Sequence, residues 1–277
     1  MSRQHASVPG VSQDEVRWRG FALLALLTAA SGCDAPAPPS KQEAKSTQSA
    51  SAAVVASAPA ASSAPPAASP PKKRDKACTK EATVTFDEPT LEQAVRRQLS
   101  KPSGPIARAE LVKVKTLDVT QAPTNDELDP CVFPELTGLK GLYLAKGLLD
   151  DLSPIRGLVN LESLRVSATS VKNIEPLKGL TKLDRLDLGR TPVADLGPLS
   201  SLVNLTELSI DETEVTDLAP LAKLKKLSVL NVKRTRVSDV SPLRELKALK
   251  NLYIEGSSIK DVSPLKELTQ LKIHEGR

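Results

Sequence analysis

The chain is poor in aromatic residues and in histidine. Its 277 residues include one Trp, two Tyr, three Phe and two His. Large enzyme cores depend on aromatic side chains, because each of them buries a large apolar surface. The histidines, His5 and His274, lie near opposite ends of the sequence, which excludes His-based triads and His-rich metal sites. We therefore expect a protein that is not an enzyme, with no catalytic residue, no metal and no cofactor.

The apolar run Phe21–Ala30 is shorter than the roughly 20 residues that a membrane-spanning helix needs. It follows Arg17 and Arg19 and precedes small residues, a pattern typical of a secretory signal peptide. The run leads into Ser31-Gly32-Cys33, which resembles the lipobox of bacterial lipoproteins. The resemblance implies an acylated Cys33 and an exported chain that is anchored by lipid in the cell envelope. The alternative is an ordinary signal peptide followed by an unrelated cysteine.

Positive charge is concentrated before the part of the chain that is expected to fold. Of the formal net charge of +5, residues 1–32 carry +1, residues 33–77 carry +3 and the remainder carries +1. A nucleic-acid-binding protein should instead carry its basic excess on the folded surface. We therefore expect no nucleic-acid partner. The Lys72-Lys73-Arg74 run is interpreted as a solvated linker end, with a contact to a membrane surface or a nucleic acid as the alternative.

Residues 35–71 have the composition of a flexible tether. Ala, Pro and Ser make up 29 of these 37 residues, and no periodic apolar pattern is present. Such a segment cannot offset the entropy cost of ordering. About 40 flexible residues would give a root-mean-square reach of roughly 35 Å between a membrane anchor and a folded domain.

An internal repeat dominates the rest of the chain. The pattern Leu139-x-x-Leu142-x-Leu144 recurs at steps of 22 residues, and a proline marks each step. The frames begin again at Leu161, Leu183, Leu205, Leu227 and Leu249, and the prolines are Pro154, Pro176, Pro198, Pro220, Pro242 and Pro264. Leu-x-Leu alternation predicts a short strand with one face buried, and the proline suits the first position of a helical turn. Because no repeat can bury its apolar face alone, neighbouring repeats should stack into a solenoid.

Two further repeat positions carry polar residues with an expected structural role. An Asp, or Asn173 in one repeat, precedes each proline by three residues. Another position holds Thr169, Thr191, Thr213, Thr235 and Ser257, whose hydroxyl groups can satisfy backbone groups where the chain leaves the strand. Gly147 interrupts this series in the first repeat.

Residues 111–271 resemble leucine-rich repeats, in the 22-residue form of internalin-like bacterial proteins. The resemblance implies an α/β solenoid with a curved parallel sheet on the concave side and short helical turns on the convex side. The stretch Phe86–Ile106 resembles the helical N-terminal cap of that class, and Thr90 with Gln93 fits a capping box. The expected organisation is a signal peptide over 1–32, the lipidated Cys33 and tether over 33–77, the cap over 78–116 and the repeat array over 117–277.

Two cysteines remain once Cys33 is assigned to the lipid. Cys78 precedes the cap, and Cys131 lies in the loop after the first strand. In an exported chain, two remaining cysteines suggest a disulfide, with two free thiols as the alternative.

The side chains between the buried leucines should form the concave surface. Tyr143 and Tyr253 occupy the same repeat position, and charges alternate in sign from one repeat to the next. The candidate binding residues are Tyr143, Arg165, Arg185, Asp187, Glu207, Asp211, Lys233 and Tyr253. The charges either pair within the sheet or bind a ligand. Tyr and Arg are favoured anchors of protein interfaces, so the sharper hypothesis is a protein or peptide ligand.

Three classes of function fit the sequence to different degrees. The first is an envelope-anchored binding module, because solenoids offer extended concave surfaces. The second is a scaffolding protein that acts through the convex face or through an uncapped C-terminal edge at Leu271–Arg277, where a homodimer could form. The third is an enzyme, against which stands the lack of a Ser/His/Asp set and of a Gly-rich phosphate loop.

Overall fold

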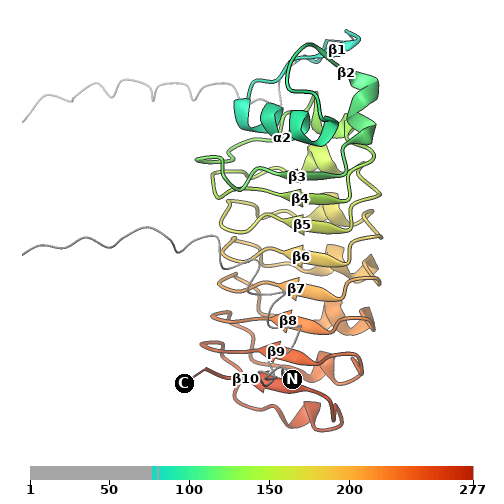
Figure 1. Cartoon of the computed structure of the whole chain (residues 1–277). Helices are drawn as coiled ribbons and strands as arrows, with labels where there is room; N and C mark the ends of the chain where they lie inside the picture. Colours follow the sequence, from blue (N-terminus) through green and yellow to red (C-terminus); the bar gives the residue numbers. More distant parts are fainter. Residues whose placement is uncertain (1–76, 80, 277) are drawn as a thin grey trace, which may run out of the picture. The chain divides into compact units, whose positions relative to one another are not determined.

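The computed structural model describes residues 77–79 and 81–276 (Figure 1). The expected signal peptide over 1–32, Cys33 and the tether up to residue 76 lie outside these residues. Within the described part, no helix is both long enough and apolar enough to cross a membrane. A small cap opens the described part, and a stack of similar repeats follows it (Figure 1).

A sheet of eight parallel strands lines one side of the stack, and its strands follow one another in chain order. Short 3₁₀ turns line the other side (Figure 1). The strands are β3 (Thr116–Asp118), β4 (Gly141–Tyr143), β5 (Ser163–Arg165), β6 (Arg185–Asp187), β7 (Glu207–Ser209), β8 (Val229–Asn231), β9 (Asn251–Tyr253) and β10 (Lys272–His274). The turns are η3 (Phe133–Glu135), η4 (Ser153–Ile155), η5 (Glu175–Leu177), η6 (Gly197–Ser201), η7 (Ala219–Lys223), η8 (Ser241–Leu243) and η9 (Ser263–Leu265). The predicted solenoid is confirmed.

Leucines of successive repeats stack on one another in the core. Leu142 pairs in register with Leu164, which lies 22 residues further along the chain, and Leu164 pairs with Leu186. The same register continues through β9, and all of these leucines are buried. Burial of one Leu side chain contributes about 1.5–3 kcal/mol. Each added repeat therefore stabilises the one before it.

The spacing differs at both ends of the sheet. Leu117 of β3 pairs with Leu142, which lies 25 residues further along, because the loop between them is longer. At the other end, Ile273 of β10 pairs with Leu252, only 21 residues away. The last repeat is therefore one residue shorter than the pattern predicts, which shifts every later position in the row.

The acidic residue before each proline caps the turn that follows. Its side-chain oxygen accepts a hydrogen bond from the backbone N–H two residues later, at 2.7 to 2.9 Å. Asn173 makes the same bond to the N–H of Glu175, because an amide oxygen accepts as a carboxylate oxygen does. The residues that act in this way are Asp151, Asn173, Asp195, Asp217, Asp239 and Asp261.

The threonine series has the predicted structural role. Each buried threonine hydroxyl donates to the carbonyl oxygen three residues earlier, as Thr213 does to Ile210 at 2.6 Å. Thr169, Thr191 and Thr235 repeat this bond at 2.6 to 2.7 Å. Gly147 interrupts the series because the loop before it packs too closely. A Cβ atom at Gly147 would lie 2.2 Å from the carbonyl oxygen of Asn125.

The cap combines one α-helix with a short hairpin. Helix α2 (Pro89–Leu99) buries Leu91 and Val95, and β1 (Thr83–Val84) pairs antiparallel with β2 (Ile106–Ala107), followed by the 3₁₀ segment η2 (Arg108–Lys113). The predicted capping box of Thr90 and Gln93 is wrong. Pro89 occupies the first helical position, so Thr90 lies inside the first turn, and Glu88 precedes the helix without a side-chain cap.

A disulfide joins Cys78 to Cys131, with 5.2 Å between the two Cα atoms. The guanidinium group of Arg108 supports the same junction. It donates to the carbonyl oxygens of Thr79 at 2.7 Å, Glu81 at 2.8 Å and Cys131 at 3.1 Å. The segment before the cap is therefore held to the first loop of the array both covalently and by hydrogen bonds.

The double variant Cys78→Ser, Cys131→Ser should lose about 4 kcal/mol of unfolding free energy, because the bridge closes a loop of 53 residues in the unfolded chain. Urea denaturation under non-oxidising and oxidising conditions measures this loss. The reduced wild type should match the double variant. Alkylation of both thiols in the unreduced, unfolded wild type would contradict the disulfide.

Candidate functional site on the face of the sheet

One row of side chains crosses the exposed face of the sheet from end to end. Tyr143 pairs in register with Arg165, Arg165 with Asp187, and the row continues to Tyr253. In order the row contains Asp118, Tyr143, Arg165, Asp187, Ser209, Asn231, Tyr253 and His274. The two tyrosines thus lie on one line, with four strands between them.

An ion pair occupies the N-terminal part of this row. Nε of Arg165 lies 3.4 Å from Oδ2 of Asp187 and also donates to Oγ of Ser167 at 3.0 Å. The Asp187 side chain is only 17% exposed, and its Oδ1 accepts from the N–H of Gly189 at 3.0 Å. Burial raises the pKa of Asp187, while the Gly189 N–H and the Arg165 charge act in the opposite direction. This pairing agrees with the predicted alternation of charges.

Arg185 and Glu207 lie beside this row and are cross-strand partners in register. Glu207 is buried, whereas the Arg185 side chain is 32% exposed. Nε of Arg185 is buried without a hydrogen-bond partner among the described residues, and the nearest carboxylate oxygen in an ion pair with it is Oδ2 of Asp184 at 3.9 Å. An unsatisfied buried donor is costly, so a ligand acceptor at this point would stabilise the arginine.

Neutral polar groups hold the middle of the face. Oγ of Ser209 donates to Oδ1 of Asp211 at 2.6 Å, and Nδ2 of Asn231 donates to the same oxygen at 3.1 Å. The expected pairing of Asp211 with Lys233 is therefore wrong. Lys233 turns instead to Glu255, with 2.9 Å between Nζ and Oε2, and this contact lowers the pKa of Glu255.

The C-terminal end of the face is an aromatic cluster. The ring of Tyr253 stacks on the ring of His274, with 4.3 Å between the centroids and 13° between the planes. Nε2 of His274 lies 3.2 Å from Oδ1 of Asn251, and Nζ of Lys233 lies 5.6 Å from the Tyr253 centroid. Sequence reasoning missed His274, because a strict step of 22 residues aligns Glu275 with Tyr253. The short spacing between Leu271 and Ile273 was the signal that could have found it.

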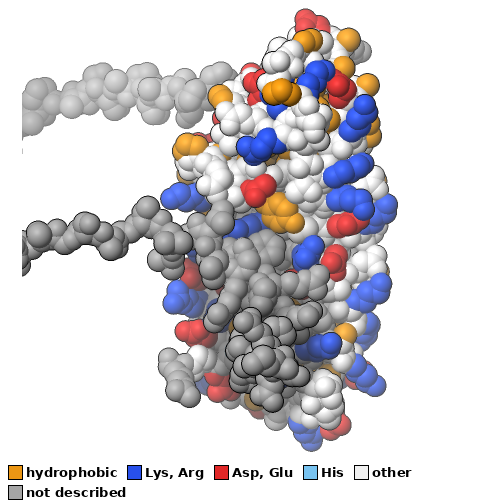
Figure 2. Space-filling model, in the orientation of Figure 1, with side chains coloured by type: hydrophobic (Ala, Val, Ile, Leu, Met, Phe, Trp, Pro, Cys, Tyr) orange, Lys and Arg blue, Asp and Glu red, His pale blue; other side chains and the backbone are white. Residues whose placement is uncertain are grey.

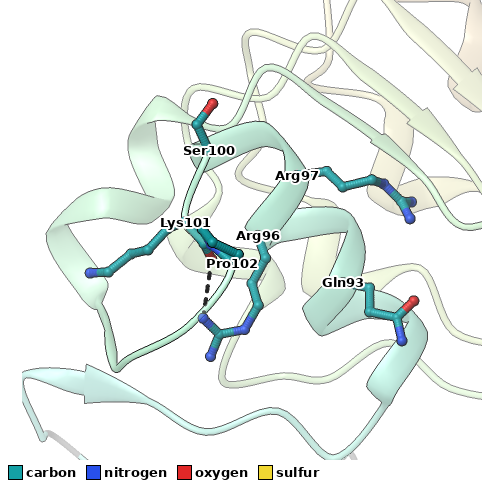
Figure 3. Close-up of a pocket in the computed structure, with 6 residues that line it drawn as sticks. All are labelled: Gln93, Arg96, Arg97, Ser100, Lys101 and Pro102. Atoms are coloured by element: carbon teal, nitrogen blue, oxygen red, sulfur yellow. Dashed lines mark hydrogen bonds between the residues drawn. The ribbon is translucent and has the colours of Figure 1, made fainter.

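A hollow on the cap offers positive charge of another kind. Its volume is about 420 Å³, and Figure 3 shows it at the end of α2, lined by Gln93, Arg96, Arg97, Ser100, Lys101 and Pro102. Carboxylates already meet two of its cations. Arg96 pairs with Glu92 at 2.8 Å, and Lys101 pairs with Glu110 at 2.9 Å. The sheet face, rather than this hollow, therefore carries the groups with the clearest capacity to bind.

Comparison with known proteins identifies the fold. No family model and no curated protein sequence matches the chain. Among solved structures, internalin C2 of Listeria monocytogenes is 29% identical, with a TM-score of 0.58 over 69% of this chain and 94% of that one. A second Listeria internalin, inlF, is 29% identical, with a TM-score of 0.61 over 68% of this chain and 56% of that one. The chain has the fold of a leucine-rich repeat protein.

A more distant leucine-rich repeat structure shares the fold alone. The ectodomain of the receptor kinase GASSHO1/SCHENGEN3 from Arabidopsis thaliana is 21% identical, with a TM-score of 0.50 over 58% of this chain and 23% of that one. That structure is a complex with Casparian strip integrity factor 2. The two Listeria structures support a bacterial leucine-rich repeat protein.

Replacing Asp187 by Asn should change how stability depends on pH. With a raised pKa, folded Asp187 keeps its proton at pH values where the unfolded chain, with an ordinary pKa of about 3.9, has lost it. The unfolding free energy of the wild type should therefore rise relative to that of Asp187→Asn as the pH falls from about 7 to about 4. Urea denaturation across this range measures the difference.

The matched control is Asp195→Asn, which changes an exposed turn cap to the residue that Asn173 already provides in another repeat. If the wild type instead loses stability relative to Asp187→Asn on acidification, the attraction of Arg165 outweighs the burial of Asp187.

Proposed function

We propose that this chain is a cell-envelope-anchored leucine-rich repeat module that binds a protein or peptide through the exposed face of its sheet. The observation that carries the proposal is the cluster around Tyr253 at the C-terminal end of the face. There a stacked aromatic pair, an amide and an ion-paired lysine meet on adjacent strands. Aromatic rings of this kind offer contact area at a low cost in conformational entropy.

Arg165 and Arg185 supply the second anchor of the proposed interface. Both side chains are partly exposed, and their counter-charges, Asp187 and Asp184, lie at 3.4 and 3.9 Å. These are longer than the 2.7–2.9 Å of a strong charge-assisted hydrogen bond. A carboxylate or backbone carbonyl of a ligand could therefore compete for either guanidinium. The proposed ligand is an extended segment that contacts the arginines on β5 and β6 and reaches Tyr253 on β9.

The likeness to other leucine-rich repeat proteins supports a binding role. The plant ectodomain of the same fold was solved in complex with another factor, and the fold itself presents a continuous row of side chains across its strands. The remaining alternative is scaffolding through the convex turns or through the edge strand β10. Pairing of two copies through β10 stays a prediction.

Envelope anchoring is the second part of the proposal. It rests on the signal-like run before Cys33 and on the disulfide between Cys78 and Cys131, since disulfides persist in oxidising compartments outside the cytoplasm. If Cys33 carries acyl chains, each buried CH₂ contributes about 0.8 kcal/mol, so two or three chains anchor firmly.

Growth with a radioactive fatty acid should label the wild type and leave Cys33→Ser unlabelled. Wild-type protein should remain with the membrane fraction, whereas the variant should be released. Cys131→Ser is the control for loss of a cysteine at another position and should keep its label. Label that persists in Cys33→Ser would rule out this anchor.

A photo-crosslinking residue at position 253 should give a defined protein or peptide adduct in living cells. The matched control is the same residue at position 178, where the lysine is exposed on the turn side and pairs with Glu175. Binding hot spots contribute about 2 kcal/mol or more, so Tyr253→Ala and Arg185→Ala should each weaken the captured partner about 30-fold. Tyr253→Phe keeps the ring and its stacking and should bind nearly as well as the wild type.

Adducts that form only from position 178 would move the interface to the turn side and favour scaffolding. Unchanged affinity in both alanine variants would contradict the proposed anchors on the sheet face.

A further inference from the structure

Charge is divided unevenly along the turn side of the array. Each repeat contributes ten residues there, from the residue before the proline to the residue before the strand. In the first three repeats, over 153–162, 175–184 and 197–206, Arg156, Lys178 and Lys182 are balanced by Glu162, Glu175 and Asp184. The same positions in the last three repeats, over 219–228, 241–250 and 263–272, hold an excess of cations over Glu245 and Glu267.

We name this second set of cations the basic face. All of its side chains belong to exposed residues, and Lys and Arg side chains are visible along the margin where the 3₁₀ turns lie (Figure 2). The basic face consists of Lys223, Lys225, Lys226, Arg244, Lys247, Lys250, Lys266 and Lys272.

The two halves of the turn side treat their cations differently. In the first half, carboxylates neutralise them: Lys178 lies 3.3 Å from Glu175, and Lys140 just before it lies 2.8 Å from Glu162. On the basic face no ion pair is found among the described residues. Lys226 donates instead to the amide oxygen of Asn204 at 2.7 Å, which leaves its charge uncompensated.

Repulsion along the basic face is built into the stacking. The residue before the strand changes from Glu162 and Asp184 through Thr206 and Ser228 to Lys250 and Lys272. The last two are adjacent, since the N–H of Lys272 donates to the carbonyl oxygen of Lys250 at 2.7 Å. Like charges on neighbouring strands are destabilising. An anionic partner would remove this repulsion.

The composition of the basic face favours a lipid surface over a nucleic acid. Its three segments contain no aromatic residue on which a base could stack. Seven of the eight cations are lysines, which act as hydrated point charges rather than as bidentate readers. The cations are also spread over three repeats, as contact with a broad charged surface requires.

We propose that the basic face binds the surface of an anionic phospholipid membrane. The choice of a membrane as the partner rests on the proposed function, which puts the chain close to one. Each lysine near an anionic surface contributes about 1 kcal/mol, and this attraction is lost over about one Debye length. Docking by this face would lay the turn side on the lipid and leave the opposite face, the sheet, open to its ligand.

Vesicle binding tests the basic face without the lipid anchor. The full chain with Cys33→Ser is mixed with vesicles of equal parts phosphatidylglycerol and phosphatidylcholine, and with vesicles of phosphatidylcholine alone. Neutral vesicles report any binding by the apolar run Phe21–Ala30, which all variants share. Sedimentation should show preferential binding to the anionic vesicles. This preference should fall steeply between about 0.1 M and 1 M salt, as the Debye length falls from about 10 Å to 3 Å.

Two variants of equal net charge separate the basic face from overall charge. Lys225→Gln, Lys247→Gln, Lys250→Gln should weaken binding to anionic vesicles at least about tenfold. Arg156→Gln, Lys178→Gln, Lys182→Gln changes the first half of the same side and should stay within about twofold. All six positions are exposed, and unchanged urea midpoints would verify that both variants fold.

Three results would overturn the proposal: no preference for anionic vesicles, equal losses in both variants, or tighter binding to DNA or polyphosphate than to lipid. Because the chain in this test carries no acyl group, its failure is distinct from a failure of Cys33 labelling. It is also independent of the crosslinking experiment at position 253.

Discussion

Every other feature of the array depends on the fact that one repeat cannot bury its own leucines. Leu142, Leu164 and Leu186 are covered only because strands pair in register and the neighbouring repeat lies against each of them. That requirement fixes the strand register, the direction of the sheet and the places where polar groups must be satisfied. The capping Asp residues and the buried Thr hydroxyls solve the same backbone problem in each layer.

Much of this fold could be predicted from the sequence, because the constraint repeats. The prolines and leucines predict the strands and the turns, and the Thr series predicts the bonds that Thr169 and Thr213 make. The predictions that failed concern places where the period breaks. Pro89 displaced the expected start of α2, and the missing residue before Ile273 brought His274, not Glu275, beside Tyr253. A strict period cannot show its own exceptions.

The candidate site was predictable in position but not in its contacts. Tyr143, Arg165, Asp187 and Tyr253 lie on one row because register follows from the repeat. Which charges pair depends on side-chain length and on burial, which periodicity does not report. Lys233 therefore reaches Glu255, while short-range hydroxyl and amide groups take Asp211. The binding role of this face remains a proposal for the same reason, since ligand recognition depends on contacts and not on register.

Net charge is a poor guide to a solenoid surface, because each repeat position forms its own row along the stack. The folded part carries little net charge by sequence, which argued against any polyanionic partner. That sum combines the acidic caps of the turns with the lysines of the basic face, although the two sets occupy different positions in each repeat. A row can change from Glu162 to Lys272 without disturbing the leucines beneath it. The sheet side and the turn side can therefore acquire separate partners, because the core that links them constrains the charge of neither.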